Sequence, residues 1–376
     1  MASQAARAKK AAEQRDALDL VSTFLVDLAG SGLGALALDR DEGAAPFDHL
    51  ARRMADADLR GVADALRRLS ALLSARADRV EGEGSEGAIR GPWEAREAEI
   101  AAGVTDLWAL VRRGQGALDR SLTGERDERQ DEDDAAVASS LGRAFKLDEL
   151  REAGFWVRDR TLVELASEQR DDPAVERVIA TGYLLDLDGG AIVREETALP
   201  YQALVSSRMP KAGARFRVSR SGVLTVKEAA LYPGNIVNRR IRWEDKVDAM
   251  VSERPLLSAD VASIHGHARP LAPLLDALRA QLKEPLGPRE AVVLLAVARF
   301  GVLGERVVAE DRTGARLVLR DPRGASCATT FNLRRAAGAF GAGSLALRLY
   351  LDLTERAVYG QALSLIAGDR LLRLGL

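Results

Sequence analysis

The sequence predicts an α+β protein, with an N-terminal helical bundle followed by hairpin-rich antiparallel β modules and intervening helices. Apolar residues recur every three or four positions in the first third of the 376-residue chain and every second position in several later segments. Turn-forming residues separate those later segments at short intervals. We predict a helical domain at 1–122, an acidic linker at 123–134, a β-rich α+β domain at 135–255 and a second α+β domain at 256–376.

The composition excludes several classes of protein. Hydrophobic residues make up 47% of the chain, enough for packed cores. The formal net charge of −2 indicates no nucleic-acid or membrane partner for the chain as a whole, although a local basic patch stays possible. There is one cysteine, Cys327, and no stretch approaches the roughly 20 apolar residues of a membrane span. We therefore expect a cytoplasmic protein without membrane contact.

The predicted bundle has three apolar stripes at helical spacing, each of which needs a partner surface. They consist of Leu18, Val21, Leu25 and Leu28; Leu59, Val62, Leu66, Leu69 and Leu73; and Ile100, Val104, Leu107 and Val111. We expect breaks at 30–34, at Pro46, at 81–92 and at Gly114 and Gly116. The segment 125–134 carries seven acids against two arginines, which predicts a solvated linker, with an acidic docking site as the alternative. A helix at 133–150 follows.

Hairpins with turn residues between their arms dominate the rest of the chain. We predict them at 183–194, 216–227, 306–320 and 361–374, with a further strand at 236–243. The alternation of leucines at 345–353 predicts a strand with one buried face. Helices are predicted at 270–282 and 288–299, each opening with a proline. The longest apolar run, 291–298, fits the second of them as a buried helix.

Familiar catalytic and phosphate-binding motifs are absent from the sequence. It has no G-x-x-x-x-G-K-[ST], no strand-linked G-x-G-x-x-G and no G-x-S-x-G. The glycines at 338–343 lack a companion lysine and predict a flexible loop, and Cys327 has no histidine near it in the sequence. We predict no catalytic residue and no cofactor. An enzyme whose residues meet only in the fold stays an alternative.

Two clusters are candidates for binding. His265 and His267 offer two imidazoles at i, i+2, to which Asp260 or Glu253 would add a third metal ligand. The simpler interpretation is a polar loop ahead of Pro270.

The second cluster combines cationic and stacking groups suited to a nucleic acid. It comprises Tyr232, Asn238, Arg239, Arg240, Arg242 and Trp243. Strand alternation offers another reading, because it places Arg240 and Arg242 on a solvated face and Ile241 and Trp243 on a packed one.

Four segments resemble the region downstream of the zinc knuckle in bacterial SWIM zinc finger family proteins. They are AARAKKAAEQRDALDLVSTFLVDLAGSGLGAL, ARRMADADLRGVADALRRLSALL, ATGYLLDLDGGAIV with ALYPGNIVNRRIRW, and RAVYGQALSLIAGDRLLRLGL. The zinc ligands of a SWIM finger, C-x-C and C-x-H, are missing, so the zinc role is not carried over to any residue. The lack of catalytic motifs, the acidic linker and the helical module predict a non-enzymatic adaptor or interaction protein. The resemblance implies a MoxR-type AAA+ ATPase or a von Willebrand factor A protein as its partner. A nucleic-acid-associated protein using the basic-aromatic cluster is the alternative.

Overall fold

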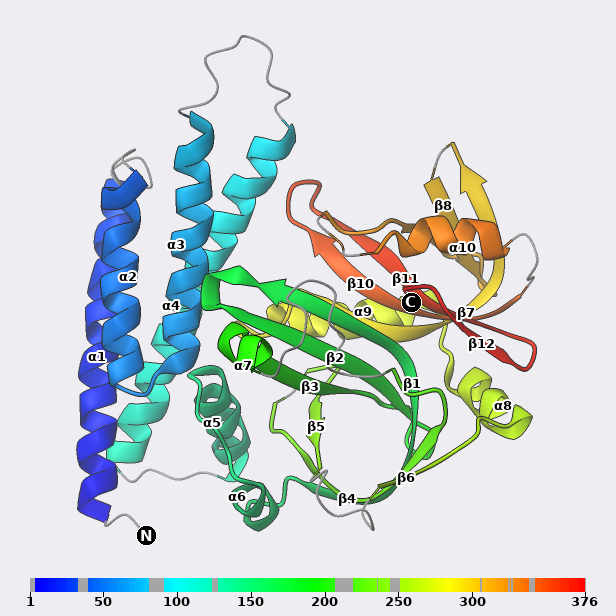
Figure 1. The fold of residues 1–376 in the computed structure, drawn as a ribbon, viewed down its shortest axis with the longest axis horizontal. Coiled ribbons are helices and arrows are strands. Elements are labelled where there is room, and N and C mark those ends of the chain that lie inside the picture. The colour runs from blue at the N-terminus through cyan, green and yellow to red at the C-terminus, as the bar shows by residue number, and fades with distance from the viewer. Residues whose placement is uncertain are drawn as a thin grey trace. The chain divides into compact units, whose positions relative to one another are not determined.

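The computed structural model describes residues 4–32, 40–80, 91–123, 128–206, 219–234, 236–243, 251–304, 306–323, 325, 327–337 and 342–375. The chain divides into two compact units, Met1–Lys146 and Leu147–Leu376, and Figure 1 shows that the first is helical and the second is built around sheets. The predicted α+β class is confirmed. No helix in the described part of the chain is long and apolar enough to cross a membrane.

The helical unit packs four long helices and a shorter fifth. Their bounds are α1 Gln4–Ser31, α2 Arg40–Asp56, α3 Arg60–Val80, α4 Gly91–Thr123 and α5 Glu128–Ser140. The three predicted stripes lie in α1, at α3 and in α4, and all their members are buried except the half-buried Val104. Helix α1 runs antiparallel to α4, since Arg15 Nε donates to Asp119 at 2.7 Å and Gln115 Nε2 donates to Asp19 at 2.7 Å.

Three predictions for this unit need correction. Pro46 lies inside α2 and Gly114 inside α4, so neither separates two helices. Gly114 serves close packing instead, because an added Cβ would lie 2.9 Å from a methyl of Leu141 and 3.0 Å from one of Leu18. The acidic segment predicted as a linker is helical from Glu128 onward, where Arg120 of α4 pairs with Asp134 and offsets part of its charge. Residues 124–127 lie outside the described part.

The second unit begins with the short helix α6 Leu147–Glu152 and a first six-stranded sheet. Its strands are β1 Trp156–Asp172, β2 Arg177–Asp186, β3 Ile192–Pro200, β4 Val223–Leu231, β5 Arg240–Arg242 and β6 Val251–Arg254. They follow the order β1-β2-β3-β5-β4-β6, and an additional pairing of β1 with β4 closes the first five into a barrel, here called barrel A. Strands β3 and β5 are parallel, and the short helix α7 Tyr201–Ser206 follows β3.

A second barrel, barrel B, repeats this path. Its sheet contains β7 Glu290–Leu303, β8 Arg306–Asp311, β9 Arg316–Leu319, β10 Gly343–Asp352, β11 Ala357–Ala367 and β12 Arg370–Arg373. The order is β10-β7-β8-β9-β11-β12, and pairing of β10 with β11 closes the barrel. Strands β9 and β11 are parallel, and α10 Thr329–Ala337 lies between β9 and β10 in the sequence. Helices α8 Ser258–His267 and α9 Leu271–Lys283 connect the two barrels.

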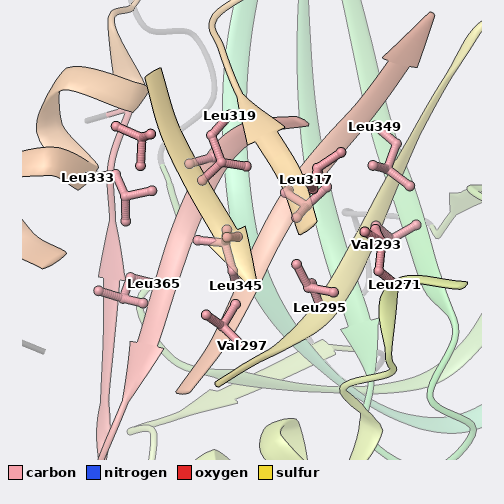
Figure 2. Packing of buried hydrophobic residues seen from close by; sticks show 14 of the residues in the cluster. Leu271, Val293, Leu295, Val297, Leu317, Leu319, Leu333, Leu345, Leu349 and Leu365 are labelled. Carbon is pink, nitrogen blue, oxygen red and sulfur yellow. The ribbon is translucent and has the colours of Figure 1, made fainter. Parts of the chain in front are cut away.

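Each barrel has an apolar interior. Figure 2 shows the interior of barrel B, where leucine and valine side chains of β7, β9 and β10 gather between Leu333 of α10 and Leu271 of α9. The interior of barrel A is smaller and contains Leu162, Leu184, Val193, Leu224, Val226, Ala229, Ile241 and Trp243. A third cluster, here called the seam, lies between the barrels and joins Leu165 and Leu185 of barrel A to Leu294 and Ile366 of barrel B.

The seam explains two wrong predictions. The segment 288–299 was predicted as a helix, but its residues from Glu290 belong to strand β7. Val293 and Leu295 point into barrel B while Val292 and Leu294 point into the seam, so both faces are apolar and no period of two is visible. For the same reason β10 has two buried faces where one was predicted.

Most of the remaining strand predictions are confirmed. The hairpins at 183–194, 306–320 and 361–374 are confirmed as β2–β3, β8–β9 and β11–β12, and the helix at 270–282 as α9. Part of 236–243 forms β5. In the predicted hairpin at 216–227, residues 216–218 lie outside the described part, and the second arm is β4, which pairs with β1, β5 and β6. The long strand β1 was not predicted.

Candidate binding face

The two barrels share one strand order. Numbering the strands of each barrel in sequence gives 1-2-3-5-4-1, with a parallel contact between the third and fifth strands and a helix after the third. This is the path of the oligonucleotide/oligosaccharide-binding (OB) fold. Barrels of this kind bind ligands on the outer face of their second and third strands and at the loops between strands 1 and 2 and strands 4 and 5. The corresponding strands here are β2–β3 and β8–β9.

In barrel A the seam covers much of that face. Tyr183 and Leu185 of β2 and Ile192 of β3 are buried against Val292 and Leu294 of barrel B. All ten residues of β2 except the first are buried, which leaves no solvent-facing row on this strand. Strand β2, the second strand of barrel A, therefore packs against barrel B instead of facing water.

A buried polar group completes the seam. Arg348 of β10, whose side chain is 9% exposed, donates to Gln361 at 3.0 Å, to the Tyr183 hydroxyl at 3.3 Å and to Glu168 of β1. The Tyr183 hydroxyl also donates to Glu168 at 3.1 Å. Burial and the nearby Glu168 carboxylate raise the pKa of Tyr183, so this hydroxyl keeps its proton. The guanidinium has partners from both barrels, as a buried charge requires.

The sequence-predicted basic-aromatic cluster is largely built into the fold. Asn238 is buried and bridges the barrels, with Nδ2 donating to Ile192 O at 3.1 Å and to Val292 O at 2.8 Å, and with Oδ1 accepting from Val292 N at 2.6 Å. Tyr232 is buried under Arg240, whose guanidinium lies 4.8 Å from the ring centroid.

The other members of this cluster divide as strand alternation predicts. Arg239 donates to Tyr232 O at 2.9 Å, and Trp243 is buried in barrel A with Arg220 over its ring. Arg242 is exposed on the opposite side of β5. The structure thus brings the six residues together around the loop between β4 and β5, but leaves neither aromatic ring open for stacking.

The histidine pair lies on helix α8 rather than in a loop. Residues i and i+2 of a helix point about 200° apart, and the two imidazoles indeed reach different elements. His265 Nε2 lies 3.2 Å from Gly368 O and its Nδ1 lies 2.7 Å from Ser344 Oγ, whereas His267 Nε2 lies 2.9 Å from Leu187 O. Asp260 is held by Arg254. The described residues contain no group of three His, Cys, Asp or Glu side chains arranged to hold a metal ion.

Barrel B leaves part of the outer face of its second and third strands in contact with water, because Arg306 and Arg316 are exposed there while Val308 is buried. Arg299 of β7 and Arg316 of β9 are 64% and 66% exposed, and Glu310 of β8 lies between them. Glu310 accepts from Arg299 at 2.8 and 2.9 Å and from Arg316 at 2.7 Å, and these bonds lower its pKa. The carboxylate therefore stays ionised and fixes both guanidinium groups on the outer face.

The other end of the same face carries Arg320 at the end of β9. Its guanidinium lies 3.9 Å from the Tyr359 ring centroid and donates to Glu355 at 2.5 Å and to Asp352. Tyr350 and Tyr359 face each other across β10 and β11, with ring centroids 6.1 Å apart. Arg306 of β8 is exposed. The pKa of Glu355 is lowered by its hydrogen bonds with Tyr359 and Arg320 and, to a smaller extent, by the positive charge of Arg306. We call Arg299, Arg306, Arg316 and Arg320 the arginine face.

Sequence reasoning missed the arginine face, although a signal was present. Arg306, Val308 and Glu310 alternate with interior residues of β8, and Arg316, Val318 and Arg320 do so in and just after β9. The glycine-rich loop offers no comparison, because residues 338–341 lie outside the described part. Searches against family models, curated proteins and solved structures found no match to this chain.

Proposed function

We propose that this chain is a non-enzymatic adaptor, in which the double barrel binds a ligand and the helical unit binds a protein partner. The observation that carries this proposal is that two barrels with the same fold differ in how much of their outer face is buried. Two barrels with the same strand order are joined through a packed seam, which buries the second strand of barrel A, whereas exposed arginines remain on the second and third strands of barrel B. A rigid scaffold that presents one outer face is suited to binding.

The groups suited to chemistry support a binding role rather than catalysis. His265 and His267 hold α8 to the two barrels through Gly368 and Leu187, and Cys327 lies 3.8 Å from the Leu374 carbonyl oxygen. The interiors of both barrels are filled by aliphatic and aromatic side chains. These groups position elements of the fold, and an enzyme remains the less favoured function.

The protein partner is proposed from the resemblance to SWIM-family proteins: a MoxR-type AAA+ ATPase or a von Willebrand factor A protein. The helical unit supports a protein contact, because it exposes large apolar side chains on two packed helices. These are Leu20 and Val26 of α1 and Trp108 and Leu122 of α4. Exposed apolar groups of this size are common at protein interfaces.

Affinity purification of the tagged full-length chain from native lysate, after chemical cross-linking, tests the proposal. An AAA+ ATPase or a von Willebrand factor A protein should co-purify, and Val26→Glu with Trp108→Glu should reduce its yield. Arg299→Gln with Arg316→Gln serves as the control and should leave the yield unchanged. A chain that elutes alone would refute the adaptor role, and turnover of a substrate by the pure chain would replace it with catalysis.

A further inference from the structure

The ligand class of the uncovered barrel face can be argued from its charge, and this step rests on the proposed function. Residues 288–376, which contain barrel B, hold 13 arginines and no lysine against eight aspartates and glutamates, a net charge of +5. The helical unit, with 21 basic and 27 acidic residues, has a net charge of −6. The positive charge of the chain is thus concentrated where the arginine face lies, and the partner of that face is anionic.

The use of arginine rather than lysine narrows the chemical class of the anionic ligand further. A guanidinium presents a planar fork of donors that suits phosphate oxygens, and it also stacks on flat rings. Arg299 and Arg316 are held in position by the shared Glu310, so little side-chain freedom is lost on binding. The Arg320 guanidinium lies 3.9 Å from the centroid of the buried Tyr359 ring, so a base at this end would stack on the guanidinium rather than on the ring.

The length of the face fits a short stretch of nucleic acid. Strand β8 carries Arg306 at one end and Glu310, with its two arginines, four residues later. At about 3.4 Å per residue this spans about 13 Å, roughly four nucleotides of a stacked strand at about 3.4 Å each. Barrels of this fold bind sites of about 4 to 16 nucleotides. Between the two ends lie Val308, which is buried, and Val318, which is half-buried, opposite each other on β8 and β9, so the contacts to a ligand come mainly from the two ends of the face.

We propose that the arginine face of barrel B binds single-stranded nucleic acid, largely without regard to sequence. Arg299, Arg306 and Arg316 contact the phosphates, and Arg320, which covers the Tyr359 ring, stacks on a base. The matching face of barrel A takes no part, because Tyr183 and Leu185 are buried in the seam.

Fluorescence anisotropy of the full-length chain with a fluorescein-labelled oligo(dT) of about 20 nucleotides tests this proposal. Three phosphate contacts predict a slope of about −2 for log affinity against log salt, or a loss of about 20-fold between about 50 and 200 mM salt. Arg299→Glu with Arg316→Glu should weaken binding at least about tenfold and make the slope shallower by about 1.4. The milder double variant Arg299→Gln with Arg316→Gln keeps hydrogen-bond donors beside Glu310 and therefore guards against misfolding caused by charge reversal. It should also weaken the binding of the oligonucleotide.

The matched control is Arg158→Gln with Arg170→Gln, which removes two exposed arginines from strand β1 of barrel A and should leave binding unchanged. Equal loss in this control, absence of binding by the wild-type chain, or equally tight binding of a duplex of the same length would each overturn the proposal. So would stronger binding of poly-glutamate, which would assign the face to an acidic protein. Failure here with intact co-purification of an AAA+ partner would leave the adaptor role standing.

Discussion

Barrels A and B follow the same strand path but differ in what covers them. In barrel A the outer face of β1 and β2 carries Leu165, Tyr183 and Leu185, which the seam removes from water. In barrel B the outer face of β8 and β9 carries Arg316 and Glu310, which stay in contact with water. The interiors are alike in being apolar. The inward residues thus specify the path, while the outward residues decide whether a face is buried or stays in contact with water.

The contrast between a buried and an exposed outer face is also seen for two single arginine side chains. Arg348 and Arg299 both point outward from barrel B and both pair with glutamate, but they are 9% and 64% exposed respectively. A buried charge depends on its partners because no water replaces them, whereas an exposed pair is screened by solvent. The seam and the arginine face should therefore respond in opposite ways to the loss of an arginine.

A large effect is expected for Arg348→Ala. It would remove a partner from Glu168, Tyr183 and Gln361 at once, and the free energy of unfolding should fall by about 3 kcal/mol, at the lower end for buried pairs because Glu168 is partly exposed. Arg299→Ala should leave the free energy of unfolding unchanged within error. Urea denaturation followed by circular dichroism measures both, and equal effects would contradict the distinction between seam and arginine face.

Leu294→Ala and Leu295→Ala test the same comparison along one strand. The first side chain lies in the seam and the second inside barrel B, and both are buried. Each substitution should lower the free energy of unfolding by about 2–5 kcal/mol, because each leaves a cavity. Thermal and urea unfolding provide the measurement. A loss below about 1 kcal/mol for Leu294→Ala alone would mean that the barrels are only loosely joined.

Asn238→Ala probes the polar edge of the seam and should have a smaller effect. The substitution leaves the amide and carbonyl of Val292 and the carbonyl of Ile192 without their side-chain partner. Buried backbone groups left in this way cost about 1–3 kcal/mol. Arg242→Ala on the nearby exposed side of β5 should change the free energy of unfolding by less than about 0.5 kcal/mol. A neutral Asn238→Ala would show that water replaces the amide.

Local chemistry made part of this fold predictable. Turn residues such as Asp188, Gly189 and Gly190 indicate the hairpin directly, and the stripes at 18–28 and 59–73 indicate the helices of the bundle. Strand β7 was missed because packing on two sides removes alternation, and that double burial is a property of the assembled barrels. Closure of each barrel depends on distant pairings such as β1 with β4 and β9 with β11, which no local pattern encodes.

The surroundings of the candidate site residues could not be predicted from the sequence, for a related reason. The segment around Arg240 and Trp243 has the residue types of a nucleic-acid site, but whether an arginine stacks on a buried ring or on a ligand is decided by what packs nearby. Arg316 and Arg320 have no special sequence context, and their exposure depends on what the assembled barrels leave in contact with water. The residue type indicates which chemistry a side chain can take part in. Burial in the folded protein decides which side chains of that type are accessible to a ligand.

The smallest effect is expected at Asp260, which ties α8 to the outer strand of barrel A. Arg254 of β6 donates to both carboxylate oxygens, at 2.6 and 2.7 Å, and these bonds hold the pKa of Asp260 below its ordinary value. A carboxylate with a lowered folded-state pKa contributes stability above its unfolded pKa of about 3.9 and loses it as the pH falls through the folded value. Asp260→Asn should therefore lower the unfolding midpoint slightly near neutral pH and progressively less below about pH 4. A difference that persists undiminished in acid would mean that packing of α8 in the seam, through Val261 and Ile264, rather than the ion pair, is what the substitution disturbs.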